Sequence, residues 1–538
     1  MNKIIMTGIW IALMMLSRHA AAQGELNYHV VLNPISVSNL PGLHSFAFGQ
    51  HQGHWLVIGG RKDGLHARQP FNAFPASMNN TDLYVIDPTT KQFWTASVSS
   101  LPTTIREQLQ STNMNFHQAG DTLYIVGGYG FAASVNGHIT FPYLTTISVS
   151  GVIQAIKNNQ PLGSFFKQIQ DTLFAVTGGH LRKLQDTFYL VGGHLFNGRY
   201  NPMNNPTFTQ RYTNQIRKFT VNNSGNQLSF GNVSAITDPI HLRRRDYNLV
   251  PQIYPNGKQG LMISSGVFQM NADLPFLYPV DIVDSGYFPK TDFNQYLSNY
   301  HSAVLPLFDS SANRMYSVFF GGMSQYYFQN GQMIQDNQVP FVRTISYVTR
   351  DANGQMNEYK LPNEMPSLKG ASAEFILNQS VPHYSNEVVK LHLLSQDSTL
   401  VGYIFGGIQS TALNPFANNQ TNLTSADPSI YEVWLVKKQT IGIPDEKLPG
   451  ENPFSIDVYP NPFKKEFVLS FVAENPIEFR YYISNAKGQL LFGSEKLFGR
   501  IGKNNVEIKV QPGSMDKELL LTVVFDNKFY VVKKVLCK

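Results

Sequence analysis

The chain has 538 residues, of which 42% are hydrophobic and 14% charged, so it can bury a core and is not intrinsically disordered. The formal net charge of +6 lies at its two ends: Lys3 and Arg18 fall in the first 22 residues, and residues 453–538 carry 13 Lys and Arg against 9 Asp and Glu. The long middle segment is therefore close to neutral, which excludes the basic face that nucleic-acid binding requires. The single cysteine, Cys537, excludes intrachain disulfides and cysteine-rich metal sites.

Residues 1–22 are typical of a secretory signal peptide. Lys3 supplies the positive start, residues 4–16 form a short apolar run, and Ala20-Ala21-Ala22 is a small-residue cleavage site before Gln23. The run is shorter than the ~20 residues that span a bilayer, and no later segment is long and apolar enough to do so. We therefore expect export through the periplasm, no membrane span in the mature chain, and a secreted or cell-surface location.

The middle of the chain repeats one unit, in which an apolar run ends in a pair of small residues. The six copies are "HWLVIGG", "DTLYIVGG", "DTFYLVGG", "GLMISSG", "MYSVFFGG" and "LVGYIFGG", with pairs that begin at Gly59, Gly127, Gly192, Ser264, Gly321 and Gly406. Each run predicts a buried strand, and the small pair allows close backbone approach or a positive φ. A second apolar strand follows each pair, so each copy predicts a small sheet.

This unit resembles the kelch repeat, which builds one four-stranded blade of a β-propeller. The resemblance covers residues 26–438, with Asp87 and the following Phe93-Trp94 as the best match to the family's later markers. It implies an all-β fold: a six-bladed kelch-type β-propeller over residues 23–438, in which an N-terminal strand near 26–42 completes the last blade. Seven blades is the alternative, because "FAVTGG" at 174–179 looks like another copy, although it lies too close to Gly193 to begin a whole blade.

A polar residue recurs near the start of each predicted innermost strand, beside the propeller axis. These residues are His44, His117, His180, Arg244 or Asp246, His301 and Glu374. Three interpretations remain open: hydrogen bonds that tie neighbouring blades together, a ligand pocket, or a metal held by imidazoles. The first is favoured, and no metal or cofactor is predicted. The run Arg243-Arg244-Arg245 before Asp246 is interpreted as a solvated turn.

Long loops after the glycine pairs open on the same face of the propeller. Residues 61–80, 194–212 and 323–338 mix Asn and Gln with Tyr, Phe and Arg, which suits sugar rings or peptides. Simple surface decoration is the alternative explanation. The ligand-binding candidates on this face and beside the axis are His44, His66, Arg68, His117, His180, Arg199, Tyr200, Arg211, Tyr326 and Tyr327.

Residues 439–452 predict a linker, and residues 453–538 a small β-sandwich of alternating strands. Its start, Tyr459-Pro460-Asn461-Pro462-Phe463, the later "SNAKGQLLF" turn and the basic end "VVKKVLCK" resemble the type A sorting domain of the Bacteroidetes type IX secretion system. The resemblance implies the type IX machinery as a partner and removal of this domain after export. Whether the mature protein is released or anchored stays open, and an ordinary accessory sandwich is the alternative.

The sequence favours a binding or interaction module for a glycan or protein ligand over an enzyme. Sialidase, serine-hydrolase, zinc-protease and nucleotide-binding motifs are missing, and Cys537 is too remote for a galactose-oxidase-like centre. The alternative is a sugar mutarotase or epimerase with an acid/base site at the axis. Its candidate catalytic residues are His180, His301, Glu374 and Arg244.

Overall fold

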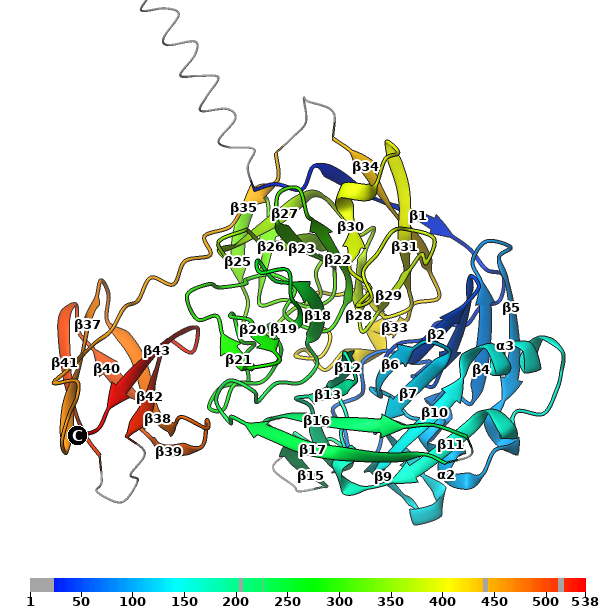
Figure 1. Ribbon diagram of the computed structural model, residues 1–538, viewed down its shortest axis with the longest axis horizontal. Helices are drawn as coiled ribbons and strands as arrows, with labels where there is room; N and C mark the ends of the chain where they lie inside the picture. The colour runs from blue at the N-terminus through cyan, green and yellow to red at the C-terminus, as the bar shows by residue number, and fades with distance from the viewer. Residues whose placement is uncertain (1–23, 203–206, 226, 439–443, 511–516) are drawn as a thin grey trace, which may run out of the picture.

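The computed structural model describes residues 24–202, 207–225, 227–438, 444–510 and 517–538. The expected signal peptide and the first residues of the expected linker lie outside these ranges. The described chain is an all-β propeller followed by a small β-sandwich. Figure 1 shows the propeller sheets following one another around a ring, from blue through cyan and green to yellow.

The described residues of the propeller form six antiparallel sheets that each have four main strands. Each sheet is built mostly from consecutive strands, because short turns join neighbours in an up-and-down order. From the innermost strand outwards, they are β2 (Ala47–His51), β3 (His54–Ile58), β4 (Asp82–Asp87), β5 (Gln92–Ser97); β6 (Asn115–Ala119), β7 (Thr122–Val126), β10 (Tyr143–Ser148), β11 (Phe166–Gln170); β12 (His180–Leu184), β13 (Thr187–Val191), β16 (Gln215–Asn222), β17 (Ser229–Thr237); β18 (Asn248–Ile253), β19 (Gln259–Ser264), β20 (Val280–Val283), β21 (Gly286–Pro289); β22 (Ala303–Asp309), β23 (Arg314–Phe320), β26 (Thr344–Arg350), β27 (Met356–Glu364); and β29 (Glu374–Leu377), β31 (Ser398–Phe405), β34 (Ile430–Lys437), β1 (Tyr28–Ile35).

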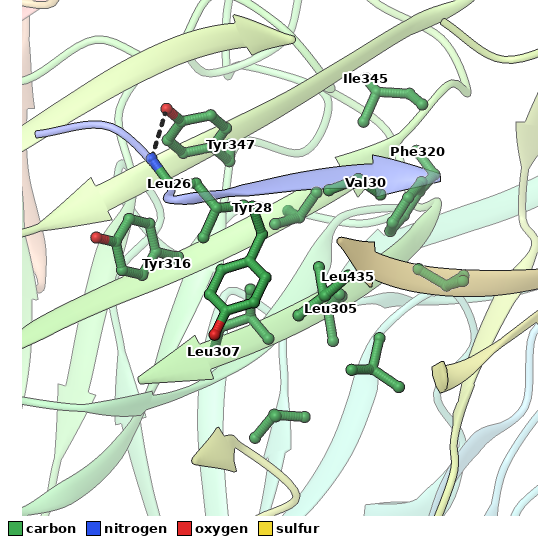
Figure 2. Close-up of a cluster of buried hydrophobic side chains, with 14 of the residues drawn as sticks. Leu26, Tyr28, Val30, Leu305, Leu307, Tyr316, Phe320, Ile345, Tyr347 and Leu435 are labelled. Carbon is green, nitrogen blue, oxygen red and sulfur yellow. Dashed lines mark hydrogen bonds between the residues drawn. The ribbon is translucent and has the colours of Figure 1, made fainter. Parts of the chain in front are cut away.

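The N-terminal strand β1 forms the outer edge of the sixth sheet. It pairs antiparallel with β34 over eight residues, from Tyr28 opposite Lys437 to Ile35 opposite Ile430. Figure 2 shows how the inward residues of β1, among them Val30, pack against the fifth sheet, and how the amide of Leu26 donates to the hydroxyl of Tyr347 at 3.2 Å. The two ends of the propeller chain thus share one sheet.

A closed cycle of backbone hydrogen bonds surrounds the axis. The residue two positions before each innermost strand donates its amide to the carbonyl of the corresponding residue of the preceding sheet, at 2.8 to 3.3 Å. We call these six residues the axial ring: Ser45, Asn113, Gly178, Asp246, His301 and Ser372. Gly178, the glycine that suggested a seventh copy, is a member of this ring and begins no sheet of its own.

The glycine pairs make a second set of contacts between sheets. The amide of Gly128 donates to the carbonyl of Val176 at 3.1 Å, and a Cβ on Gly127 would lie 1.9 Å from that oxygen. Only glycine allows the two backbones to come this close with φ of +68° and +93° at the pair. In the fourth copy the sequence suggested Ser264 and Ser265 as the equivalent pair, but the structure shows that it is Ser265 and Gly266. Both of these residues have positive φ, and the amide of Gly266 donates to the carbonyl of Asn299.

Short hairpins and helices occupy the segments between the main strands of the propeller. The hairpins and short sheets are β8 (Tyr129–Ala132) with β9 (Gly137–Thr140), β14 (His194–Gly198) with β15 (Phe208–Tyr212), β24 (Tyr326–Gln329) with β25 (Gln332–Gln335), and β28 (Leu368–Ala371) with β32 (Ile408–Ser410) and β33 (Thr424–Ala426). The helices are α2 (Thr103–Leu109) and α3 (Val149–Lys157), and β30 (Val389–Lys390) and β35 (Glu446–Lys447) extend the fifth sheet. Within the described ranges, no helix has the length and apolar character needed to cross a bilayer.

The C-terminal sandwich has two sheets around an aromatic core that includes Phe471, Phe479 and Phe525. One sheet contains β36 (Asp457–Tyr459), β37 (Glu466–Ala473) and β41 (Gly502–Lys509); the other contains β39 (Leu490–Gly493), β38 (Ile477–Asn485), β40 (Leu497–Gly499), β42 (Glu518–Phe525) and β43 (Phe529–Leu536). Tyr530 of β43 packs on Tyr278 of the propeller, with ring centroids 4.7 Å apart.

Candidate functional site

On one face of the propeller, the residue directly before an axial-ring residue pairs with the residue directly after a glycine pair. His44 pairs with Arg61, Thr177 with His194, and Arg245 with Val267. Because each pairing places a post-glycine loop beside the axis, the loops surround the end of the central channel. We call this end the mouth and define it by Arg245, His194, Tyr200, Tyr212 and Tyr300.

Arg245 is the charged centre of the mouth. Its Nη1 donates to Nδ1 of His194 at 3.3 Å, and its Nε lies 3.6 Å from the carboxylate of Asp246. Its guanidinium also faces the rings of Phe268 and Tyr212, at 5.1 and 5.7 Å from their centroids. The side chains of Arg245 and Asp246 are 20% and 32% exposed, so solvent reaches both.

Tyrosines surround this guanidinium. Burial acts to lower the pKa of Arg245, but Tyr212, Asp246 and Tyr300 raise it above its ordinary value. Burial raises the pKa of Tyr300, and Asp246 raises it further, so this tyrosine is neutral and its hydroxyl can donate a hydrogen bond. The hydroxyls of Tyr200 and Tyr300 make no hydrogen bond with any described residue. The mouth therefore presents the charge of Arg245 beside aromatic faces and free hydroxyl groups, and Arg243 adds a second guanidinium 3.8 Å from the Tyr212 ring centroid.

Loops from the first, third and sixth sheets meet beside the mouth in an aromatic cluster. His66 stacks on Phe74 with centroids 4.5 Å apart and makes edge contacts with Tyr200 at 5.0 Å and Phe416 at 5.2 Å. Burial lowers the pKa of His66 to about 4, so its imidazole is neutral. Arg68 donates to the carbonyl of Ala417 at 3.0 Å. His66 and Arg68 thus hold the loops together.

The other loop-face candidates are divided between this cluster and more distant positions. Arg199 donates to the carbonyl of Phe71 at 3.0 Å and lies 3.4 Å from His138, so it also ties loops together. Arg211 is exposed on β15. Tyr326 is buried against Tyr296 on the β24 hairpin, beside the half-buried Tyr327. The structure therefore joins His66, Arg68, Arg199 and Tyr200 in one region and leaves Tyr326 and Tyr327 outside it.

His301 of the axial ring forms a close pair with Glu374, which begins the innermost strand of the sixth sheet. Nε2 of His301 lies 3.4 Å from Oε1 of Glu374. Burial raises the pKa of Glu374 to about 8 and lowers that of His301 to about 4, so at neutral pH the carboxyl is largely protonated and the imidazole is neutral. The contact is therefore a neutral acid/base pair that links the fifth sheet to the sixth.

His180 lies beside this pair. Its Nε2 lies 2.5 Å from the carbonyl oxygen of Tyr247, so Nε2 carries the proton and donates it across to the fourth sheet. Its ring centroid is 5.0 Å from that of His301. The cavity that these side chains line has a volume of about 20 Å³, which is the room that one water molecule needs. His180 thus acts as a tie between sheets.

The polar residues beside the axis do not share one structural position, contrary to the expectation from their spacing. His301 is itself in the axial ring, whereas His180 and Glu374 lie two residues beyond their ring residues, and His117 lies four beyond. His44 precedes its ring residue, Ser45, and contacts the Ser45 hydroxyl at 3.0 Å. Among the described residues, no group of three or more His, Cys, Asp or Glu side chains is placed to hold a metal ion.

Arg244 does not reach the axis. Its side chain is fully buried in the fourth sheet and donates to the carbonyls of His241, Ser265 and Tyr278 at 2.7 to 2.9 Å. Its guanidinium also stacks 4.2 Å from the ring centroid of Phe276. The interpretation of residues 243–245 as a solvated turn was therefore wrong, and Arg244 is a core residue that cannot position a substrate in the channel.

Arg182 was missed by the sequence analysis. It lies on β12 two residues after His180. Burial, and to a smaller extent the charge of Arg182, lowers the pKa of His117 to about 3. It also acts on His301 and Glu374. Alternate residues of a strand point to the same side, so the position of His180 was the signal that could have found it.

Comparisons with known proteins find likenesses among solved structures. No family model matches the chain, and no curated protein matches it. Among solved structures, one described as "Structure of YjhT" aligns with 73% of this chain and 97% of its own, at 11% sequence identity and a TM-score of 0.39.

Proposed function

We propose that this protein is an exported kelch-type propeller that binds a glycan at the mouth. The observation that carries the proposal is the position of Arg245, which is solvent-accessible and has Tyr200, Tyr212 and Tyr300 around it. An aromatic face beside a charged donor and free hydroxyls suits a sugar ring with its polar substituents. A protein ligand on the same face is the other outcome of the test.

The cavity size favours binding over catalysis. A sugar requires far more room than the about 20 Å³ between His180, His301 and Glu374, whereas a ligand at the mouth does not have to pass the axial ring. The His301–Glu374 contact of 3.4 Å is the observation that favours the second candidate, a sugar mutarotase or epimerase. That enzyme would use these two groups as acid and base.

The binding test is a glycan screen with residues 23–538, followed by titration of any glycan that binds. Replacing Arg245 by Gln removes a charge-assisted contact and is expected to weaken binding by about tenfold or more. Arg500→Gln, at an exposed arginine of the sandwich, is the matched control and keeps the affinity. If no glycan binds, or if both variants bind like the wild type, the glycan proposal fails, and capture of surface proteins tests the other ligand class.

The enzyme candidate has a separate test. Sugars are incubated with the protein, and anomeric exchange is followed by NMR. Activity that is lost in Glu374→Gln but retained in Arg245→Gln would assign the function to the channel. No exchange above the uncatalysed rate would remove the candidate.

We further propose export by a type IX secretion system through residues 453–538. The marks of the resemblance lie side by side: Oδ1 of Asn461 accepts the amide of Leu536 at 2.8 Å, and the amide of Phe463 donates to the carbonyl of Leu536 at 2.8 Å. One surface of the sandwich thus contains both the "YPNPF" segment and the basic C-terminal strand. In a Bacteroidetes host, removal of 453–538 is expected to leave the protein in the periplasm; equal surface exposure of both forms would contradict this.

A further inference from the structure

The ring of Tyr530 is inserted into a socket on the propeller. Its centroid lies 4.7 Å from that of Tyr278, 6.0 Å from that of Phe276 and 6.3 Å from that of His241. Its hydroxyl donates to Oε1 of Gln269 at 3.1 Å, and only 5% of the residue is exposed. A buried aromatic ring with a satisfied hydroxyl is typical of the residues that dominate the affinity of protein interfaces.

Apolar packing and hydrogen bonds surround this socket. Tyr482 and Val524 of the sandwich belong to the same hydrophobic cluster as core residues of the third and fourth propeller sheets. Nδ2 of Asn271 donates to the hydroxyl of Tyr482 at 2.5 Å. Nε2 of Gln269 donates to the carbonyl of Asn527 at 2.7 Å. The contact therefore combines an apolar centre with satisfied polar groups, as stable protein interfaces do.

The turn between β38 and β39, which lies in the "SNAKGQLLF" segment, fits against the propeller. Gly488 in this turn has a φ of +80°, and a Cβ added there would lie 2.7 Å from the carbonyl oxygen of Thr237 and 3.0 Å from the hydroxyl of Tyr287. Gly502 of the same sandwich has a φ of +88°, but nothing lies within 4 Å of an added Cβ. Of these two glycines, only Gly488 is thus required by the contact with the propeller.

The end of the expected linker is also fixed to the propeller. Residues 446–447 form β35, which pairs with β27 of the fifth sheet, and Leu448 is buried. Nδ2 of Asn452 donates to the carbonyl of Thr291 in the propeller at 2.9 Å and to that of Tyr530 in the sandwich at 2.8 Å. The sandwich is therefore seated on the propeller and does not hang from a free tether.

We propose that residues 454–538 are a detachable subunit that stays bound when the chain is cut next to Pro453, and that the Tyr530 socket is its docking site. The partner that this surface fits is a β-strand that presents a tyrosine, supplied here by β43 of the same chain. Cutting removes one covalent bond but none of the contacts above, and these join surfaces that are already folded and positioned.

The docking has a consequence that rests on the sorting role proposed above for residues 453–538. Cleavage of a sorting domain that stays docked does not by itself free the propeller, which remains wherever the sandwich is held. The contact itself does not depend on the export route. A test on purified protein therefore leaves the export proposal untouched, and failure of the export proposal leaves the socket untouched.

A cut between the two parts tests the docking directly. A recognition sequence for a site-specific protease is inserted after Pro453, which is exposed, and residues 23–538 are cut to completion. Size-exclusion chromatography of the native sample at micromolar concentration is compared with a denaturing gel of each fraction. We expect both fragments in one peak, at the elution volume of the uncut chain. Separation of the two fragments would overturn the proposal.

Substitutions then show whether the described surface holds the fragments. Gly488→Ala is expected to raise the dissociation constant of the cut chain by roughly tenfold or more, because the added methyl group meets the propeller. Gly502→Ala introduces the same backbone strain without that contact and is the matched control, so it should bind like the wild type. An unchanged dissociation constant for Gly488→Ala would contradict the proposal, as would equal weakening by both variants.

A third variant changes the propeller side. Asn271 is exposed, so Asn271→Ala should fold normally and lose only the hydrogen bond to Tyr482. We expect it to weaken the association of the fragments by roughly three- to tenfold. It also decides the case if Gly488→Ala does not fold, since an unchanged dissociation constant for Asn271→Ala would then count against the docking site.

Discussion

The amide of Ser45 donates to the carbonyl of Ser372 at 3.2 Å, and this bond joins the first propeller sheet to the last beside the axis. The same two sheets are also joined by the amide of Gly407, which donates to the carbonyl of Leu43 at 2.9 Å. Each sheet supplies one residue of the axial ring, and the second residue of its glycine pair donates its amide to a carbonyl of the neighbouring sheet. Closure of the propeller therefore rests on backbone hydrogen bonds. Side chains at the axis are consequently free to differ from sheet to sheet.

The close backbone approach at the glycine pairs gives the first prediction. Gly127→Ala should destabilise the protein by about 2–4 kcal/mol, because the new Cβ would lie 1.9 Å from the carbonyl oxygen of Val176 and the positive φ adds strain. Gly53→Ala is the control: its φ is +79°, but nothing lies within 4 Å of the added Cβ, so it should cost only about 1 kcal/mol. Chemical denaturation of both variants tests the difference, and equal losses would refute the crowding argument.

The repeat could be read from the sequence because its signals are local. An apolar run and a glycine pair each follow from the conformation of a few adjacent residues, so the sheets and their glycine turns were predictable. The register of the fourth copy was not, since Ser265 adopts a φ of +52° that serine rarely takes, and the pair therefore includes Gly266. That choice is decided by the hydrogen bond from Gly266 to Asn299, which is a contact between sheets.

The site was less predictable than the fold. Arg244 and Arg245 are adjacent in the sequence, yet the first lies in the core and the second at the mouth, because successive residues of an extended chain point in opposite directions. Arg182 acts on His117 and Glu374, which come from two other sheets, so its importance could not be read from its own strand. Local patterns thus located the axis, while the charges that matter there depend on contacts between distant sheets.

The N-terminal strand provides a matched pair of substitutions. Val30 is fully buried against the fifth sheet, whereas its neighbour Val31 points outwards and is 37% exposed. Val30→Ala should lower the free energy of unfolding by about 1–3 kcal/mol through the cavity it leaves, and Val31→Ala by less than about 0.5 kcal/mol. Urea denaturation measures both values. Similar effects at the two positions would show that β1 does not seal the sixth sheet as described.

Glu358 should make stability depend on pH. It is fully buried, accepts the amides of Tyr296 and Leu297 at 2.7 and 3.0 Å, and burial raises its pKa to about 8 from the ordinary 4.5. The folded protein therefore holds this proton more tightly than the unfolded chain. Its contribution to stability is complete below pH 4.5 and is lost as the pH rises to about 8, by at most about 1.4 kcal/mol per pH unit.

Substitution of Glu358 isolates that contribution. As the pH rises from 5 to 8, the free energy of unfolding of the wild type should fall relative to that of Glu358→Gln, because glutamine has no proton to lose. The exposed Glu364→Gln, on the same strand β27, should show no such trend. Urea denaturation at three pH values tests this, and a constant difference between wild type and Glu358→Gln would mean that the carboxyl titrates near its ordinary pKa.

Tyr530 should hold the sandwich against the propeller. Its ring packs on Tyr278, and its hydroxyl donates to Oε1 of Gln269 at 3.1 Å, so Tyr530→Ala removes both an aromatic contact and a buried hydrogen bond at the junction. We expect this variant to unfold in two separate calorimetric transitions and to be cleaved faster within residues 439–452. Tyr459→Ala, in the same sandwich but 44% exposed, should behave like the wild type. If Tyr530→Ala keeps a single transition and the wild-type cleavage rate, the two parts are held together by contacts other than this one.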